Sequence, residues 1–247
     1  MMLRLRCALL MILCFPFFSM AQQADSLAKK NTFRIAPFII PTVFISYGLM
    51  AKGDNFIRDL DRTTQSELQE DHPKFSKSAD DFMRYVPALA VYGLNLASVK
   101  GRNNLLDATG NYAVSMGIMT AVVAIAKKQS HRLRPDGSSY DSFPSGHAAA
   151  SFASAEFLKQ EYKDVSPWLG YAGYVVATTT GVFRLYNNKH WVSDVVAGAG
   201  VGILSAKLGY LVYPPLKRLI MGRKQTNFNL MPAYQEKALG FSFSGRF

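Results

Sequence analysis

Three short groups of charged, hydroxyl and imidazole side chains interrupt the apolar segments in the second half of the chain. They comprise Lys127 with Arg134 and Pro135, then the run Pro144 to His147, and finally Arg184, His190 and Asp194. Any one group is explained at least as well by an ordinary structural role. The three in this order, each at the end of an apolar segment, are a strong indication of a reactive site.

The cations in these groups suit an anionic substrate. A phosphate ester in transfer spreads charge over three equatorial oxygens, so catalysis needs fixed positive groups and backbone donors around them. Lys127, Arg134 and Arg184 supply three cations, and the two guanidiniums can bind oxygens in a bidentate way. Ser145 and Gly146 lie where a loop is expected to meet a helix. The free N–H groups of a helix start favour an anion there.

Two imidazoles complete the predicted chemistry. His190 and Asp194 are four residues apart, a spacing that predicts one helical face. A carboxylate in that position would fix the imidazole tautomer and stabilise the cation formed when the other ring nitrogen attacks. His147 is suited to protonating a leaving alkoxide and later to activating water.

Together these residues resemble the superfamily of type 2 phosphatidic acid phosphatases and vanadium haloperoxidases. The family signature is K-x6-R-P, then P-S-G-H, then S-R-x5-H-x3-D, and the matching residues run from Lys127 to Asp194. The spacing selects Lys127 rather than Lys128, since only Lys127 has six residues before Arg134.

The resemblance implies a role for each matching residue. His190 would be the nucleophile, Asp194 its orienting partner and His147 the general acid and base. The residues that would hold phosphate are Lys127, Arg134, Ser145, Gly146 and Arg184.

The family's phosphatases use no metal, so the resemblance implies neither metal nor cofactor. His72 and His131 are expected to be surface residues rather than ligands. One position departs from the signature: Phe183 stands where the family usually has Ser. The lost hydroxyl would cost about 1 kcal/mol for each hydrogen bond removed.

The N-terminus predicts export. Arg4 and Arg6 precede the apolar run from Cys7 to Phe18, and small residues at Ser19 and Ala21 suit signal-peptidase cleavage. A retained membrane anchor is the alternative, although the run is short for a span of about 20 residues. Cleavage after Ala21 would also remove both cysteines, so no disulfide and no thiolate chemistry is expected. The predicted location is the cell envelope, on the periplasmic side.

The length and net charge of the chain limit its number of domains and the classes of partner that it can bind. A chain of 247 residues has room for one domain, and its net charge of +11 suits anionic partners such as phosphorylated substrates or acidic lipids. Nucleic acid is not expected, because the basic residues are scattered and no reader motif accompanies them. Hydrophobic residues make up 49%, yet the mean hydropathy of +0.04 is low for a protein of lipid-bathed helices alone.

The pattern of the remaining segments predicts an all-α fold, a bundle of about six helices embedded in or associated with a membrane, with a short β-like C-terminal tail. Expected helices cover residues 35–50, 82–99, 111–126, 148–162, 168–182 and 191–213. Residues 52–81 are charged and predict an exposed loop with one polar helix near 59–70. The expected division is a signal peptide at 1–21, a helix and polar loop at 22–81, a catalytic bundle at 82–215, and a basic linker and tail at 216–247.

Details of these segments refine the membrane prediction. Residues 148–162 contain Glu156 and Lys159, which predicts an amphipathic helix rather than a lipid-facing one. Small residues at Gly198, Gly200 and Gly202 predict close helix packing. Three spans before Lys127 would place the site in the cytoplasm, so we expect at least one early segment not to cross.

The C-terminal tail alternates Phe241, Phe243 and Phe247 with small residues, a period typical of a strand. A short terminal hairpin is favoured over contact with an outer membrane or a barrel partner.

Four functions remain open from the sequence. A phosphatase acting on a lipid phosphate is favoured, because apolar helices flank the predicted site. The alternatives are a soluble-type nonspecific acid phosphatase, a vanadate haloperoxidase with His190 as vanadium ligand, and a non-enzymatic envelope protein. The lipid headgroup, the number of spans and the oligomeric state stay open.

Overall fold

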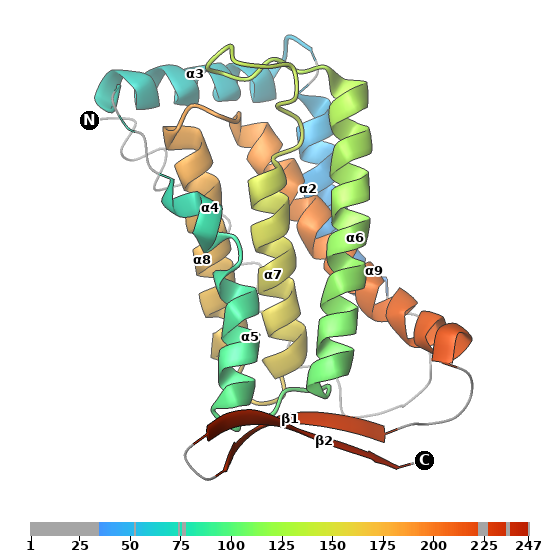
Figure 1. The fold of residues 1–247 in the computed structure, drawn as a ribbon. Coiled ribbons are helices and arrows are strands. Elements are labelled where there is room, and N and C mark those ends of the chain that lie inside the picture. Colours follow the sequence, from blue (N-terminus) through green and yellow to red (C-terminus); the bar gives the residue numbers. More distant parts are fainter. Residues whose placement is uncertain are drawn as a thin grey trace. The chain divides into compact units, whose positions relative to one another are not determined.

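The computed structural model describes residues 35–51, 53–73, 75, 78–221, 227–235 and 238–246. These residues form eight helices and two strands (Figure 1). The helices are α2 (Ala36–Met50), α3 (Phe56–Asp71), α4 (Ala79–Met83), α5 (Val86–Leu96), α6 (Leu105–Ser130), α7 (Gly146–Tyr162), α8 (Pro167–Tyr186) and α9 (Val192–Met221). The predicted signal peptide at 1–21 lies outside the described residues.

The predicted helical bundle is confirmed, with eight described helices where about six were expected. The segment 52–81 accounts for much of the difference. The polar helix expected near 59–70 is confirmed as α3, which is capped by Asn55: the Asn55 side chain accepts hydrogen bonds from the N–H groups of Ile57 and Arg58. The rest of the segment is not simply an exposed loop. Asp61 on α3 and Asp80 on α4 are each only 1% exposed. Their carboxylates have partners far away in sequence, which no local pattern reveals. The helix expected over 82–99 is likewise divided between α4 and α5.

The centre of the bundle is α7, which packs against α5, α6, α8 and α9 (Figure 1). It is buried on nearly all sides, so it does not face lipid, as predicted, but it has no polar solvent face and the prediction of an amphipathic helix was wrong. Glu156 is fully buried because its carboxylate pairs with Lys207 of α9 at 2.6 Å and accepts hydrogen bonds from Gln160 and Tyr174. A charged residue in a helix therefore does not mark a solvent face when a partner neutralises it.

Small residues on α9 determine how closely the helices approach, as predicted. A Cβ atom on Gly202 would lie 2.2 Å from the carbonyl oxygen of Ala149 on α7. On Gly200, two residues earlier and so on nearly the opposite side of the helix, it would lie 2.6 Å from the carbonyl oxygen of Pro41 on α2. Only a residue without a side chain permits both contacts, so α9 is held between α7 and α2 by backbone surfaces.

The two strands follow α9, which continues through Pro214 and Pro215 beyond the expected boundary at residue 215. Strands β1 (Asn227–Gln235) and β2 (Ala238–Arg246) pair antiparallel, with Asn227 opposite Arg246 and Gln235 opposite Ala238. Phe241 and Phe243 of the predicted tail lie in β2, and Phe247 lies outside the described residues.

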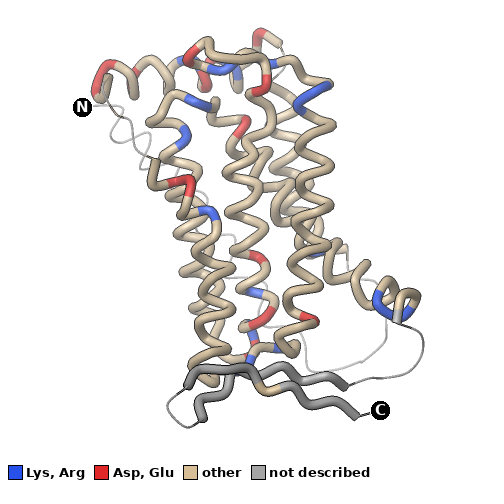
Figure 2. Tube along the Cα trace, viewed as in Figure 1, with Lys and Arg blue, Asp and Glu red and all other residues tan. Residues whose placement is uncertain are grey.

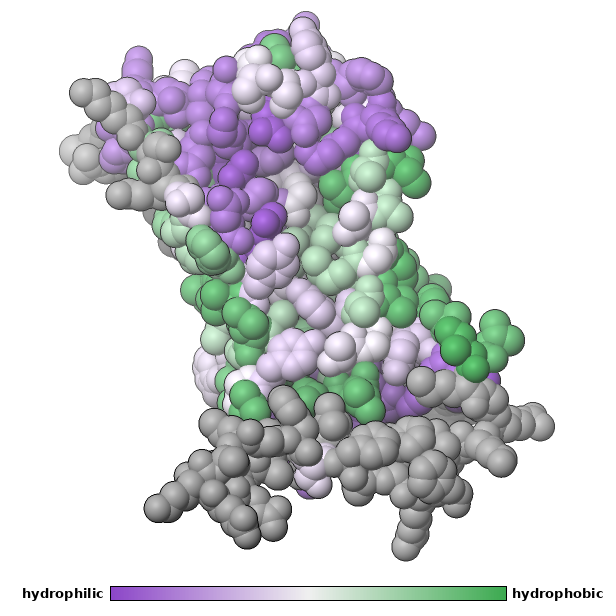
Figure 3. Space-filling view, viewed as in Figure 1, coloured by the Kyte–Doolittle hydropathy of each residue, from purple (hydrophilic) through white to green (hydrophobic). Residues whose placement is uncertain are grey.

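Polar and apolar surfaces are separated along the bundle. Charged residues gather at the end that carries α3 and the loop 131–145, and the adjoining flank is largely apolar (Figures 2 and 3). Large apolar side chains that are more than half exposed occur on several helices, for example Ile39 of α2, Leu89 of α5, Ile125 of α6 and Val175 of α8. In the described part of the chain, α6 and α9 are long and apolar enough to cross a membrane, by length and composition alone.

The close packing of α9 can be tested with two glycine variants. We expect Gly202→Ala to lower the free energy of unfolding by about 1–3 kcal/mol, because its methyl group would overlap the α7 backbone. The control is Gly117→Ala on α6, where a Cβ would meet nothing within 4 Å. The control should leave stability unchanged or raise it by about 0.5–1 kcal/mol. Thermal unfolding of both variants in one detergent measures this, and equal behaviour of the two would contradict the packing argument.

Candidate active site

The three groups of residues meet at the charged end of the bundle. Lys127 lies in the last turn of α6, Arg184 in the last turn of α8, and Asp194 in the first turn of α9. Ser145 is the N-cap of α7, as expected for a loop that meets a helix, and its side chain accepts a hydrogen bond from the Ala148 N–H. Its own N–H donates to the carbonyl oxygen of Asp194 at 3.0 Å, which joins the second group to the third.

The first two cations share one carboxylate. Asp141, in the loop before α7, lies 3.3 Å from Lys127 Nζ through Oδ2 and accepts a hydrogen bond from Arg134 Nη2 at 3.1 Å. Lys127 also donates to the Asp141 carbonyl oxygen. Burial alone would raise the pKa of the Asp141 carboxyl, but the hydrogen bond from Ser139 and the two cations together lower it to about 2. Asp141 therefore stays ionised at any ordinary pH and is the anion that neutralises the two cations.

A second pair of carboxylates comes from α4. Asp80 binds Arg184 Nη1 through Oδ2 at 2.6 Å, and both side chains are almost wholly buried. Asp81 lies 2.7 Å from His147 Nε2 through Oδ1, and Arg84 Nη1 lies 3.3 Å from the same ring nitrogen. Sequence reasoning missed these residues because it placed them in a loop. Their only local signal is a pair of adjacent acidic residues close before an arginine.

Asp80, Asp81 and His147 also offer ligand atoms within 4.8 Å of one another. These residues do not suit a metal ion. Arg184 already takes one Asp80 oxygen, and Arg84 adds a second positive charge beside the imidazole. A divalent cation would have to displace or repel two guanidiniums.

His190 lies before α9 rather than within it, so the prediction that it shares a helical face with Asp194 was wrong. The chain leaves α8 at Tyr186 and turns through Asn188, which has a positive φ of 56°. His190 Nδ1 is 3.8 Å from Asp194 Oδ2, too far for a hydrogen bond. The imidazole is only 3% exposed. Burial lowers the pKa of His190, against the opposing charge of Asp194, and so favours the neutral ring.

Asp194 is held by other groups. Its carboxylate accepts hydrogen bonds from Arg132 Nη1 at 2.7 Å, from the Trp191 N–H at 3.0 Å and from the Ser142 hydroxyl. Each donor comes from a loop that borders the site. The carboxylate is thus fixed in position before any substrate arrives.

Arg132 is the main residue that sequence reasoning missed. Its second nitrogen, Nη2, donates to Asp61 of α3 at 2.6 Å, so one guanidinium joins two buried carboxylates. Asp61 in turn accepts hydrogen bonds from the N–H and hydroxyl of Ser193, at 2.9 and 2.6 Å. Asp61 thereby satisfies a free N–H at the start of α9. Arg132 lies two residues before Arg134 in a basic stretch of the sequence. Nothing in the sequence connects it to Asp61.

Phe183, the departure from the signature, lies beside Arg184 without joining its ion pair. Its ring packs against Phe75, with the ring centroids 5.9 Å apart. This contact agrees with a packing role in the bundle.

The bridge through Arg132 predicts a large effect on stability. We expect Arg132→Met to lower the free energy of unfolding by about 3–5 kcal/mol, because it leaves two buried carboxylates without their cation. Arg62→Met is the matched control, since Arg62 pairs with Asp54 at 3.3 Å on the surface. That exposed pair should contribute less than about 1 kcal/mol. Chemical or thermal unfolding compares the two, and a similar loss in both would refute the bridge as a structural element.

The shared carboxylate predicts competition with added anions. Asp141→Asn removes the negative charge that neutralises Lys127 and Arg134, so inorganic phosphate should bind about two- to fivefold more tightly. Asp136→Asn is the control, because Asp136 lies in the same loop as Asp141 but pairs with a different cation, Lys189, at 2.6 Å. Titration calorimetry with inorganic phosphate measures both. Weaker binding to Asp141→Asn than to the unaltered chain would show that Asp141 helps to hold the anion instead.

Comparison with known proteins bears on the family of the chain. A model of the PAP2 superfamily matches residues 108–218. Lipid A 1-phosphatase of Porphyromonas gingivalis is 36% identical over 189 residues, which is 74% of this chain. The alignment covers 39% of that relative, so the chain spans about two fifths of the relative's length.

Two solved structures are similar. A transmembrane PAP2 type phosphatidylglycerolphosphate phosphatase from Bacillus subtilis aligns with a TM-score of 0.50 at 19% identity, over 75% of this chain and 99% of that one. LpxE of Aquifex aeolicus aligns with a TM-score of 0.43 at 19% identity, over 59% of this chain and 93% of that one. The family match, the identity to a curated relative and the fold shared with the Bacillus protein agree with the three motifs, and the chain belongs to the PAP2 superfamily.

Proposed function

We propose that this protein is a metal-independent phosphatase that hydrolyses phosphate monoesters of lipids through a phosphohistidine intermediate. One observation carries the proposal. The buried imidazole of His190 is close enough to Arg184 and Lys127 for their positive charges to lower its pKa. His147 lies at the same end of the bundle. A neutral buried nucleophile close to cations suits attack on a phosphate group.

The geometry supports a two-step reaction. The Nδ1 edge of His190 faces Asp194, which leaves Nε2 to attack phosphorus while the bond to the alkoxide oxygen breaks. His147 protonates the departing alkoxide and then takes a proton from the water that cleaves the P–N bond. Lys127, Arg134 and Arg184 stabilise the oxygens, together with N–H groups in the first turn of α7 after Ser145. The imidazolium formed at His190 is stabilised by the fixed charge of Asp194.

A lipid substrate is favoured by the surface beside the site. The charged end of the bundle borders an apolar flank (Figure 3), and α6 has 19 uncharged residues from Ala108 to Ala126, a length of about 28 Å. That length suits the hydrocarbon core of a bilayer, which is about 30 Å thick. We infer that α6 and α9 cross a membrane, with the site at one face near the headgroups. The named activity of the 36% identical relative makes a lipid A phosphate the first substrate to assay.

The proposal also covers the location of the active site and its distinction from a soluble-type acid phosphatase. The predicted export signal places the site on the periplasmic side of the cell envelope. A soluble-type acid phosphatase would use the same residues, and equal rates on a water-soluble ester and a dispersed lipid would favour it. The exposed apolar side chains favour the lipid enzyme.

The proposed nucleophile can be tested by trapping. His190→Ala should lower kcat by at least about a thousandfold, as expected when a covalent nucleophile is removed. His147→Ala should slow both steps but still accept phosphate on His190, and His72→Ala, at an exposed position, should leave the rate unchanged. The assay uses lipid A and a panel of phospholipids as substrates. Rapid quenching followed by mass spectrometry identifies the peptide that carries the trapped phosphate.

The same assay tests the independence from metal and the pH dependence. Activity should survive excess EDTA. Because burial lowers the pKa of His190 below 6.5, the acid limb of kcat/KM should have its midpoint below pH 6.5. Phosphate trapped on His147, or activity lost in chelator and restored by magnesium, would refute the mechanism.

A further inference from the structure

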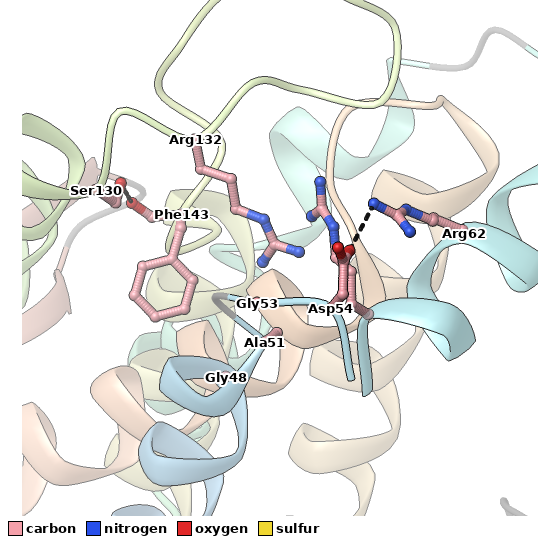
Figure 4. A pocket seen from close by; sticks show the side chains of 9 residues that line it. Gly48, Ala51, Gly53, Asp54, Arg62, Ser130, Arg132 and Phe143 are labelled. Carbon is pink, nitrogen blue, oxygen red and sulfur yellow. Dashed lines mark hydrogen bonds and ion pairs between the residues drawn. The ribbon is translucent and has the colours of Figure 1, made fainter. Parts of the chain in front are cut away.

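One cavity among the described residues lies away from the motif residues. A pocket of about 490 Å³ lies where the end of α2, the start of α3 and the segment 130–143 meet (Figure 4). Its lining residues are Gly48, Ala51, Gly53, Asp54, Arg58, Arg62, Ser130, Arg132 and Phe143. None of these is a motif residue that the family resemblance assigns. The volume is that of a small-ligand pocket.

Three guanidiniums line this pocket, and they differ in their partners. Arg132 is neutralised by two buried carboxylates, and Arg62 pairs with Asp54 at 3.3 Å (Figure 4). Arg58 has no ion pair within the described residues. Its guanidinium instead lies over the Trp191 ring, 4.8 Å from the ring centroid.

Arg58 is half-buried, so water compensates its charge only in part. Burial lowers the pKa of its guanidinium, the neighbouring charges of Arg132 and Arg62 act in the same direction, and the carboxylates of Asp61 and Asp194 oppose them only in part. A positive charge in this position would gain from an anion, and a guanidinium fork matches the oxygens of phosphate. Gly48, Ala51 and Phe143 supply an apolar part of the lining.

We propose that this pocket is a second anion site that binds a phosphate group, with Arg58 as its principal ligand. Arg132 separates it from the catalytic residues, since the same guanidinium lines the pocket and donates to Asp194. The phosphate is either a second phosphate group on a substrate whose first lies at His190, or free phosphate. The first source rests on the proposed function, whereas the anion site itself does not.

Direct binding tests the site without any turnover. Inorganic phosphate titrated into the purified full-length protein should occupy two classes of site. Arg134→Gln should weaken the catalytic class, and Arg58→Gln should weaken the other by about 10- to 100-fold, as expected for one lost charged hydrogen bond. Arg58→Lys keeps the charge and should lose less. Arg102→Gln is the matched control, because it removes an exposed charge from the opposite end of the bundle, near the start of α6.

Kinetics then distinguish the two sources. Two lipids with the same acyl chains, one with a single phosphate and one with two, are compared in Arg58→Gln. If the second phosphate of the substrate occupies the pocket, KM rises about tenfold for the bisphosphorylated lipid alone. If the pocket holds free phosphate, both KM values stay unchanged while the second binding class is lost.

Unchanged phosphate binding in Arg58→Gln, with unchanged thermal unfolding, would overturn the proposal. A folding defect in that variant is recognised from its unfolding temperature, and Arg58→Lys then carries the test. If no lipid is hydrolysed, the proposed function fails, but the phosphate titration still decides whether the pocket binds an anion.

Discussion

The buried guanidinium of Arg132 is the interaction on which the arrangement of the site depends. It donates to Asp194 at 2.7 Å and to Asp61 at 2.6 Å, and both carboxylates are inaccessible to water. Bringing three charges into the interior is costly, and well-packed apolar residues often stabilise a fold as much or more. The charges instead fix the positions of the segments and side chains that they join. They hold α3 over the start of α9 and fix the carboxylate that faces His190.

A second constraint is the repulsion among the cations that would bind phosphate. Lys127, Arg134 and Arg184 lie at one end of the bundle, and each has a carboxylate of the chain as its partner. Asp141 and Asp80 neutralise these charges and hold the side chains in place before an anion arrives. A site organised in advance does not spend binding free energy on ordering its own donors. Under the proposed function, an incoming phosphate would take the place of a carboxylate instead of assembling the site.

Several features of this protein follow from local patterns in its sequence. The helical bundle, the close approach at Gly200 and Gly202, and the N-cap at Ser145 are each encoded by residues near one another in the chain. The family also follows, because the motif depends on spacing and residue type. Most of the predictions that failed concern charges. Glu156 indicated an amphipathic helix, and the charged residues of 52–81 indicated a mostly exposed loop, but carboxylates in both segments are buried by partners elsewhere in the chain.

The sequence alone therefore determined the fold class, the family and the residues of the three motifs. Tertiary structure decided which carboxylate faces which cation, that His190 precedes α9, and that Arg58 lines a pocket. Asp61 and Ser193 are 132 positions apart, and Asp80 and Arg184 are 104 apart. A hydrogen bond or ion pair over such a separation leaves no period or spacing in the sequence. It exists only because packing of the helices brings the two groups together and excludes water from them.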